Sequence, residues 1–196
     1  MIIKSLVDFF KLIRYDYKQD LEKISKICYY TKTREDLTKN KFVMSRGCEQ
    51  PFILKALVDY FKPVSFFEIG TGRGTACYSV SLNKNIKEIY TVDILNFDQR
   101  RLTAIGHRKA NVSNKDLFGY IPYSEKSKIK FNTRKNLIRD IPKLENNFDM
   151  CFIDGEHCDQ KVIMEDFNIC KKIVKEGGIF IFDDYGPDRF SVKKVV

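Results

Sequence analysis

The sequence predicts an α/β protein in which residues 63–196 form a parallel sheet with helices on both faces, preceded by a helical cap in residues 1–62. Three observations predict this fold. From Pro63 onward, apolar runs of strand length alternate with stretches of helical period, as in parallel sheets. The first run ends in FFEIGTGRG (66–74), with a glycine at every second position. Carboxylates close several later runs, at the strand ends where such sheets bind ligands.

The N-terminal cap is expected from helical periodicity. Residues 3–14 and 18–29 fit helices, and PFILKALVDYF (51–61) has proline at a favourable first helical position. Between them, residues 31–50 are polar and carry turn signals. No apolar run approaches the ~20 residues of a bilayer span, and charges interrupt the apolar N-terminus, so no signal peptide is expected.

Five strands are expected in the second part. They are VSFFEIG (64–70), EIYTVDI (88–94), KIKF (128–131), FDMCFID (148–154) and IFIFDD (179–184). A helix fits residues 74–84. A second helix should end at Gly177 and Gly178. The long basic link between the second and third strands is expected to be helical or to cover a substrate.

The amino-acid composition limits the classes of binding partner that are expected. The apolar fraction of 43% is that of a globular protein, and the net charge of +9 comes from 35 basic residues mixed with 26 acidic ones. Because the charges are interspersed, nucleic acid is a less favoured partner than a small molecule. Six cysteines without a C-x-x-C pair or a histidine cluster indicate reduced thiols and a cytoplasmic location, and no membrane partner is expected.

The glycine turn predicts a nucleotide-like cofactor. Glycine permits positive φ and lets a ligand approach the backbone. Asp93 ends the second strand, where a carboxylate can accept hydrogen bonds from both ribose hydroxyls of an adenosine. Glu68 would repel a pyrophosphate and suits a cationic ligand such as S-adenosylmethionine, and Gly74 comes one residue too early for the dinucleotide pattern G-x-G-x-x-G. The alternative interpretation is that the glycines only form a tight strand–helix turn and that Asp93 is a solvated residue at a strand end.

A second group of polar residues predicts a metal site. Asp154, Asp183 and Asp184 close the fourth and fifth strands. Clustered carboxylates repel one another unless a cation binds, and oxygen ligands select Mg²⁺ or a similar divalent ion. His157 follows Asp154 by three residues and can take a proton from a substrate hydroxyl. The alternative is that the aspartates cap helices and His157 has no chemical role.

FFEIGTGRG followed by YTVDI resembles motif I and the acidic loop of class I S-adenosylmethionine-dependent methyltransferases, which have a Rossmann-like fold. The resemblance implies that Glu68 lies beside the methionine moiety and that Asp93 binds the ribose. Asn132 or Thr133 would stand in for the acid that the family commonly has near the adenine. The cofactor-binding residues expected are Glu68, Gly70, Thr71, Gly72, Gly74, Asp93, Ile94, Asn132, Thr133 and Asp154.

FDMCFIDGEH and GGIFIFDDY resemble the metal-dependent small-molecule O-methyltransferases, above all the branch with macrolide sugar O-methyltransferases and cephalosporin-hydroxylase-like proteins. This similarity covers about residues 63–190. It implies that Asp154, Asp183 and Asp184 bind Mg²⁺ and that His157 is the catalytic base. The family sheet has seven strands, of which the first five are expected here and the C-terminal two are absent.

The expected function is therefore Mg²⁺-assisted O-methylation of a hydroxyl on a small molecule or sugar. An RNA or DNA methyltransferase is the first alternative, favoured by charge. However, DGEH (154–157) stands where base-modifying enzymes usually carry Asn/Asp-Pro-Pro-aromatic. A non-catalytic or fragmentary cofactor-binding module is the second alternative.

Overall fold

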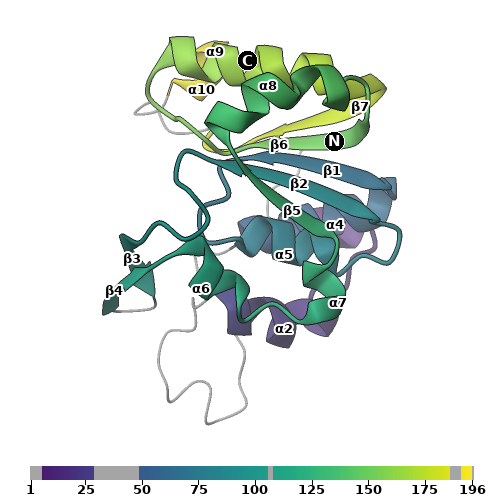
Figure 1. The fold of residues 1–196 in the computed structure, drawn as a ribbon. Helices are drawn as coiled ribbons and strands as arrows, with labels where there is room; N and C mark the ends of the chain where they lie inside the picture. Colours follow the sequence, from purple (N-terminus) through teal and green to yellow (C-terminus); the bar gives the residue numbers. More distant parts are fainter. Residues whose placement is uncertain (1–5, 29–48, 106–107, 186–190, 196) are drawn as a thin grey trace. The chain divides into compact units, whose positions relative to one another are not determined.

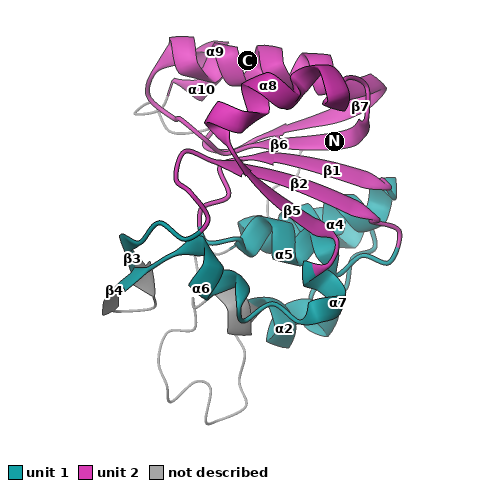
Figure 2. Cartoon of the chain, viewed as in Figure 1, with its two compact units in different colours: residues 1–62, 73–84, 98–126 teal, residues 63–72, 85–97, 127–196 magenta. Residues whose placement is uncertain are grey.

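The computed structural model describes the backbone of residues 6–28, 49–105, 108–185 and 191–195. The chain forms two compact units, coloured separately in Figure 2. Unit 1 comprises residues 1–62, 73–84 and 98–126, and unit 2 comprises residues 63–72, 85–97 and 127–196. The chain first passes between the units after Lys62, where the sequence places the domain boundary. The expected division into a cap and a sheet domain stays a prediction, because unit 1 also takes in two later segments.

Unit 2 is built on a parallel five-stranded sheet with the order β5-β2-β1-β6-β7 (Figure 1). The strands are β1 (Ser65–Ile69), β2 (Glu88–Asp93), β5 (Ile129–Thr133), β6 (Phe148–Ile153) and β7 (Val174–Phe182). In this register Glu68 of β1 lies between Thr91 of β2 and Phe152 of β6. The predicted parallel α/β fold is confirmed, and each expected strand occurs.

Helices α8 (Arg134–Leu144) and α9 (Gln160–Ile173) lie along the same sheet, as Figure 1 shows. Helix α8 contacts β2 and β5, whereas α9 contacts β6, β7 and the short helix α10 (Val192–Val195). Their apolar side chains pack with alternate strand residues into one core, which contains Phe67, Ile69, Tyr90, Val92, Leu137, Phe148, Cys151, Ile153, Cys170, Ile173 and Val174. This packing holds the carboxyl ends of the strands in place.

The start of β7 differs from the sequence expectation. Gly177 and Gly178 lie inside the strand and do not stop the preceding helix, which ends at Ile173. The pairing of β6 with β7 shifts register between Phe148 and Met150. A Cβ added to Gly178 would lie 2.3 Å from Val174 Cγ1. The glycines therefore serve an irregularity within the strand, which is a common use of glycine in sheets.

Unit 1 contains mostly helices. They are α1 (Leu6–Leu12), α2 (Lys18–Cys28), α4 (Gln50–Phe61), α5 (Thr75–Ser81), α6 (Asn114–Phe118) and α7 (Tyr123–Lys126). The link expected to be helix or lid also forms an antiparallel hairpin of β3 (Arg101–Ile105) and β4 (Arg108–Val112). Ser113 then starts α6 with a capping box, in which its hydroxyl accepts from Asp116 N and its own amide donates to the Asp116 carboxylate.

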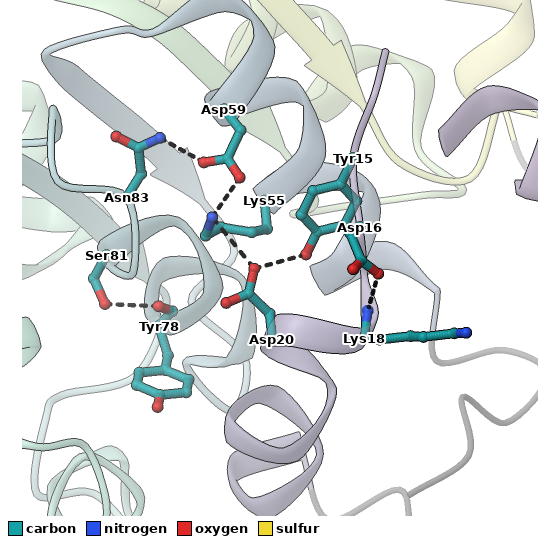
Figure 3. Close-up of polar contacts among 9 residues, drawn as sticks. All are labelled: Tyr15, Asp16, Lys18, Asp20, Lys55, Asp59, Tyr78, Ser81 and Asn83. Carbon is teal, nitrogen blue, oxygen red and sulfur yellow. Dashed lines mark hydrogen bonds and ion pairs between the residues drawn. The ribbon is translucent and has the colours of Figure 1, made fainter. Parts of the chain in front are cut away.

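A buried lysine joins three segments of unit 1 (Figure 3). Lys55 Nζ of α4 lies 2.5 Å from Asp59 Oδ2 and 3.3 Å from Asp20 Oδ2 of α2. Tyr15 donates to Asp20 Oδ2 at 3.0 Å, and Asn83 donates to Asp59 Oδ1 at 2.6 Å. Burial, together with the neighbouring Asp20 carboxylate, raises the pKa of Tyr15 far above its ordinary value. The network thus joins α2 and α4 by ion pairs of Lys55, and hydrogen bonds add Tyr15 before α2 and Asn83 after α5.

Among the residues described, no helix combines the length and the apolar character that a bilayer span requires.

Candidate functional site

Backbone hydrogen bonds connect the carboxyl ends of the neighbouring strands β2, β1 and β6 in unit 2. After β1 the chain turns at Gly70, and the amides of Gly70 and Thr71 both donate to Val92 O of β2, at 2.8 and 3.1 Å. On the other side, Asp154 N donates to Ile69 O at 2.8 Å. The glycine turn, the end of β2 and the residue after β6 therefore occupy fixed positions relative to one another.

Gly70 is the tightest point of this arrangement. Its φ is +98°, and an added Cβ would lie 1.9 Å from the carbonyl oxygen of Asp154. The turn therefore packs directly against the Asp154 backbone, which only glycine allows. Gly72 also has positive φ, but a Cβ there would meet nothing closer than 3.9 Å. Gly74 precedes α5 within unit 1, and a Cβ there would lie 2.6 Å from the Phe118 ring.

Glu68 lies inside the unit. It is fully buried in β1, and its Oε2 accepts a hydrogen bond from Thr91 Oγ1. Thr91 Oγ1 in turn lies 2.7 Å from Thr71 Oγ1 in the glycine turn. The carboxylate thus reaches the turn through two hydroxyl groups. Its placement beside the methionine moiety stays a prediction, and the connection through Thr91 was not expected from the sequence.

Asp93 closes β2 with a buried side chain, whose Oδ1 accepts from Leu95 N at 3.1 Å. Ile94 next to it is 80% exposed. An aromatic pair that the sequence did not predict lies nearby in the chain: the ring centroids of Phe97 and Phe131 are 4.9 Å apart. The alternation of polar and apolar residues along KIKF could have indicated which sheet face Phe131 occupies. In the structure Phe131 pairs with Thr91 of β2, so the two side chains lie on the same face.

Asn132 and Thr133 make protein contacts at the start of α8. Asn132 Nδ2 donates to Tyr90 Oη and to Asp140 Oδ2, and Asn132 Oδ1 accepts from Thr133 N at 2.8 Å. Thr133 Oγ1 accepts from Asn136 N and caps the helix. Both protons of Asn132 Nδ2 are used in these bonds, whereas Oδ1 has a second lone pair that could accept from an adenine amino group. Their expected role near the adenine stays a prediction.

Acidic residues after β6 and β7 lie close together, but the residues in this group differ from the three predicted metal ligands. Ligand atoms of Asp154, His157 and Asp184 all lie within 4.8 Å of one another. His157 Nδ1 is 2.9 Å from Asp184 Oδ2. Asp183 is not in this group, and its amide continues the sheet by donating to Ile153 O at 3.1 Å. Both aspartates follow the end of β7 at Phe182, and the chain turns at Asp184, whose φ is +54°. Backbone geometry therefore separates the two aspartates.

His157 lies in a loop before α9, which begins three residues later at Gln160. Glu156 Oε1 holds this loop by accepting from the amides of Cys158 at 2.8 Å, His157 at 3.0 Å and Asp159 at 3.4 Å. These hydrogen bonds, led by that of Cys158, lower the pKa of Glu156.

Asp159 is the cap of α9. Its Oδ1 accepts from Lys161 N at 2.9 Å and from Val162 N at 3.4 Å. The sequence left open whether the predicted metal ligands cap helices. For α9 the cap is a fourth aspartate, Asp159. Asp154 is placed instead in the group with His157 and Asp184. Two carboxylates and an imidazole at this spacing can bind a divalent cation or act as a histidine oriented by an aspartate.

A family model described as a methyltransferase domain matches residues 67–185. An uncharacterized protein of Acanthamoeba polyphaga mimivirus is 32% identical over 142 residues, which make up 71% of this chain and 60% of that protein. The chain thus spans about 60% of the length of this curated relative.

Solved structures share the fold. An O-methyltransferase from Bacillus cereus, in complex with SAH, has a TM-score of 0.54 at 15% identity, covering 89% of this chain and 70% of its own. The O-methyltransferase TomG from Streptomyces achromogenes, involved in tomaymycin synthesis and in complex with SAM, has a TM-score of 0.53 at 16% identity, covering 96% and 79%. At these identities the likeness concerns the arrangement of strands and helices.

Proposed function

This chain belongs to the methyltransferase-domain family, and from that premise we propose that it transfers a methyl group from S-adenosylmethionine to a hydroxyl of a small molecule or sugar, assisted by a divalent cation. One observation carries the proposal. The glycine turn packs on the Asp154 backbone with no room for a side chain at Gly70, beside the strand that ends in Asp93. A tight glycine turn at one strand end, beside a neighbouring strand that ends in a carboxylate, is typical of nucleoside sites.

The residues present fit the cofactor. Asp93 would accept hydrogen bonds from the ribose hydroxyls, and Ile94 would offer an exposed apolar side chain to the adenine. Thr71 and Gly72 form the turn that would approach the methionine end, with Glu68 buried behind it. S-adenosylmethionine would supply an activated methyl group on a sulfonium. No phosphate has to be accommodated, which agrees with a carboxylate so close to the turn.

The acceptor would be activated at the other group of polar residues. Mg²⁺ prefers oxygen ligands, so we assign Asp154 and Asp184 as its protein ligands and leave Asp183 outside the group. His157 would be the base. Its Nδ1 faces Asp184 Oδ2, which fixes the ring, and Nε2 would then take the hydroxyl proton. The cation would lower the pKa of the hydroxyl.

The first prediction tests the cofactor. Calorimetric titration should show binding of S-adenosylmethionine and no binding of NAD. Replacing Asp93 by alanine should weaken binding by about 1–3 kcal/mol, the scale of hydrogen bonds to a charged group. Asp98→Ala is the matched control, because Asp98 is an exposed carboxylate five residues further along the same link. Tight NAD binding, or equal affinities of the two variants, would contradict the cofactor assignment.

The second prediction concerns His157. Turnover should be screened with sugar and catechol acceptors, with and without Mg²⁺. His157→Ala should lower turnover by about 10²–10⁴-fold, the usual contribution of a general base, and should leave the dissociation constant of S-adenosylmethionine nearly unchanged. A variant that methylates normally would remove His157 from the mechanism. Methylation of an RNA oligonucleotide, with none of the small acceptors modified, would favour the nucleic-acid alternative.

A further inference from the structure

We propose that Thr91 is a positioning residue, whose hydroxyl links the buried carboxylate of Glu68 to Thr71 and thereby sets the glycine turn for cofactor binding. The inference rests on the proposed function and deepens it, since it states how Glu68 acts on the site. No atom of Thr91 needs to touch the cofactor in this arrangement. Its effect passes through the side chain of Thr71.

The direction of the hydrogen bonds follows from proton counting. A threonine hydroxyl has one proton and two lone pairs. Thr91 donates its proton to Glu68 Oε2. In the 2.7 Å contact between the two threonine hydroxyls, Thr91 must then accept and Thr71 must donate. The carboxyl oxygen at one end therefore orients both hydroxyls and points the Thr71 proton into the sheet.

Burial makes this link strong. Glu68 and Thr91 have no exposed surface, and Thr71 is 3% exposed. Water does not compete for hydroxyls so deeply buried, and a partner left unsatisfied there costs its full desolvation. Glu68 and Thr91 also lie opposite each other in the β1–β2 register. The link is thus built on two paired strands, which is a rigid base for a turn that must hold one shape.

Thr71 is held in two ways. Its amide donates to Val92 O at 3.1 Å, and its hydroxyl donates to Thr91. The backbone bond fixes where the turn begins, and the side-chain bond fixes the rotation of the residue between Gly70 and Gly72. Removing the Thr91 hydroxyl should therefore loosen the turn while the strand pairing of β1 with β2 remains.

The test uses Thr91→Val, which keeps the shape and removes the hydroxyl, and Thr91→Ser, which keeps the hydroxyl. Calorimetry with S-adenosylmethionine should show about tenfold weaker binding for Thr91→Val and near-wild-type binding for Thr91→Ser. Thr103→Val is the control, because it makes the same substitution in β3, away from the Glu68–Thr91–Thr71 link. Equal affinities of wild type and Thr91→Val, with unchanged turn dynamics, would overturn the proposal.

A second variant separates positioning from direct charge contact. In Glu68→Gln the amide oxygen can still accept from Thr91, so the link survives without the charge. Binding should then be weakened less by Glu68→Gln than by Thr91→Val. A much larger loss in Glu68→Gln would mean that the carboxylate acts on the cofactor by its charge, and the proposal would be wrong.

Hydrogen exchange of the ligand-free protein keeps the inference separate from the proposed function. The amides of Gly70, Thr71 and Gly72 should exchange faster in Thr91→Val and normally in Thr91→Ser. If that pattern appears but the wild type binds no S-adenosylmethionine, the link stands and the proposed function fails. If Thr91→Val does not fold, Thr71→Val removes only the outer bond, and unchanged exchange and affinity in that variant would overturn the proposal.

Discussion

Gly70 and Gly72 belong to the same turn but differ in the space that a side chain would find there. Gly70 and Gly72 both have positive φ, +98° and +52°. An alanine at Gly70 would collide with the Asp154 carbonyl, whereas the Cβ of an alanine at Gly72 would meet only Gly70 O, at 3.9 Å, and would carry the strain of a left-handed φ. Steric contact, and not backbone conformation alone, distinguishes the two positions.

The third prediction follows from this contrast. Gly70→Ala should lower the free energy of unfolding by more than the ~1–3 kcal/mol of a strained backbone position, because the Asp154 backbone must also move. Gly72→Ala should cost about 1–2 kcal/mol. Urea unfolding followed by circular dichroism measures both. Similar losses in the two variants would show that the contact at Asp154 relaxes without cost.

Sequence reasoning places individual residues well where the chemistry is local. The positions of Gly70 and Asp93 at the ends of adjacent strands follow from counting along two apolar runs. Thr91 could not be singled out in this way, because its importance depends on its register with Glu68 across two strands. Asp183 and Asp184 are likewise indistinguishable in the sequence, because the positive φ that turns the chain at Asp184 cannot be read from it.

At the scale of elements, Asp149 fastens three strands. Its Oδ2 accepts from the amides of Val64 at 2.8 Å and Ser65 at 3.0 Å, at the start of β1. Its Oδ1 accepts from Lys175 Nζ of β7 at 2.7 Å. Partial burial raises the pKa of Asp149, but the Lys175 bond and the β1 amides outweigh it, so the pKa lies below its ordinary value.

The fourth prediction is the acid sensitivity that results. A lowered folded-state pKa gives stability that is present above the unfolded value of about 3.9 and is lost as pH falls through the folded one. Asp149→Asn should lower the free energy of unfolding at pH 7 by about 1–3 kcal/mol and flatten its decline below pH 4. Asp98→Asn is the exposed control. An unchanged acid profile in Asp149→Asn would contradict this role.

Element boundaries were the part of the fold least accessible from sequence. The helix predicted before Gly177 and Gly178 occurs as α9, but it ends at Ile173 and not at the glycine pair. Pairing with β6 extends β7 back to Val174 and overrides that local signal. The β3–β4 hairpin was missed because its strands are basic and do not alternate cleanly between apolar and polar residues.

At the scale of the whole molecule, pH acts through buried tyrosines. Burial and Asp20 raise the pKa of Tyr15, and burial also raises that of Tyr90. Such groups ionise readily only in the unfolded chain. A raised pKa contributes stability that is complete below the unfolded value of about 10 and is lost as pH rises above it. The protein should therefore lose stability at alkaline pH.

The fifth prediction isolates the share of Tyr15. Tyr15→Phe should lower the melting temperature slightly at pH 8, because the bond to Asp20 is lost, and should reduce the further decrease between pH 9 and 11. Tyr17→Phe is the matched control, since its ring also packs on Phe10, with centroids 5.7 Å apart. Thermal unfolding across this range measures both variants. An alkaline decrease as steep in Tyr15→Phe as in the wild type would exclude Tyr15 as its source.

The overall sheet was predictable because strand and helix periods alternate plainly from residue 63 onward. The division into two units was not, because it depends on which segments pack together and not on their order in the chain.

That division has a consequence for dissecting the protein. Six segments alternate between the units, so the chain passes from one to the other five times, and one passage falls at Gly72–Arg73 within the glycine turn. No single cut yields either unit whole. A fragment ending at Lys62 would carry Lys55 and Asp59 but lack Asn83, which binds Asp59 from a later segment. Because segments of the two units alternate along the chain, shortening it from either end past its terminal segment removes parts of both units.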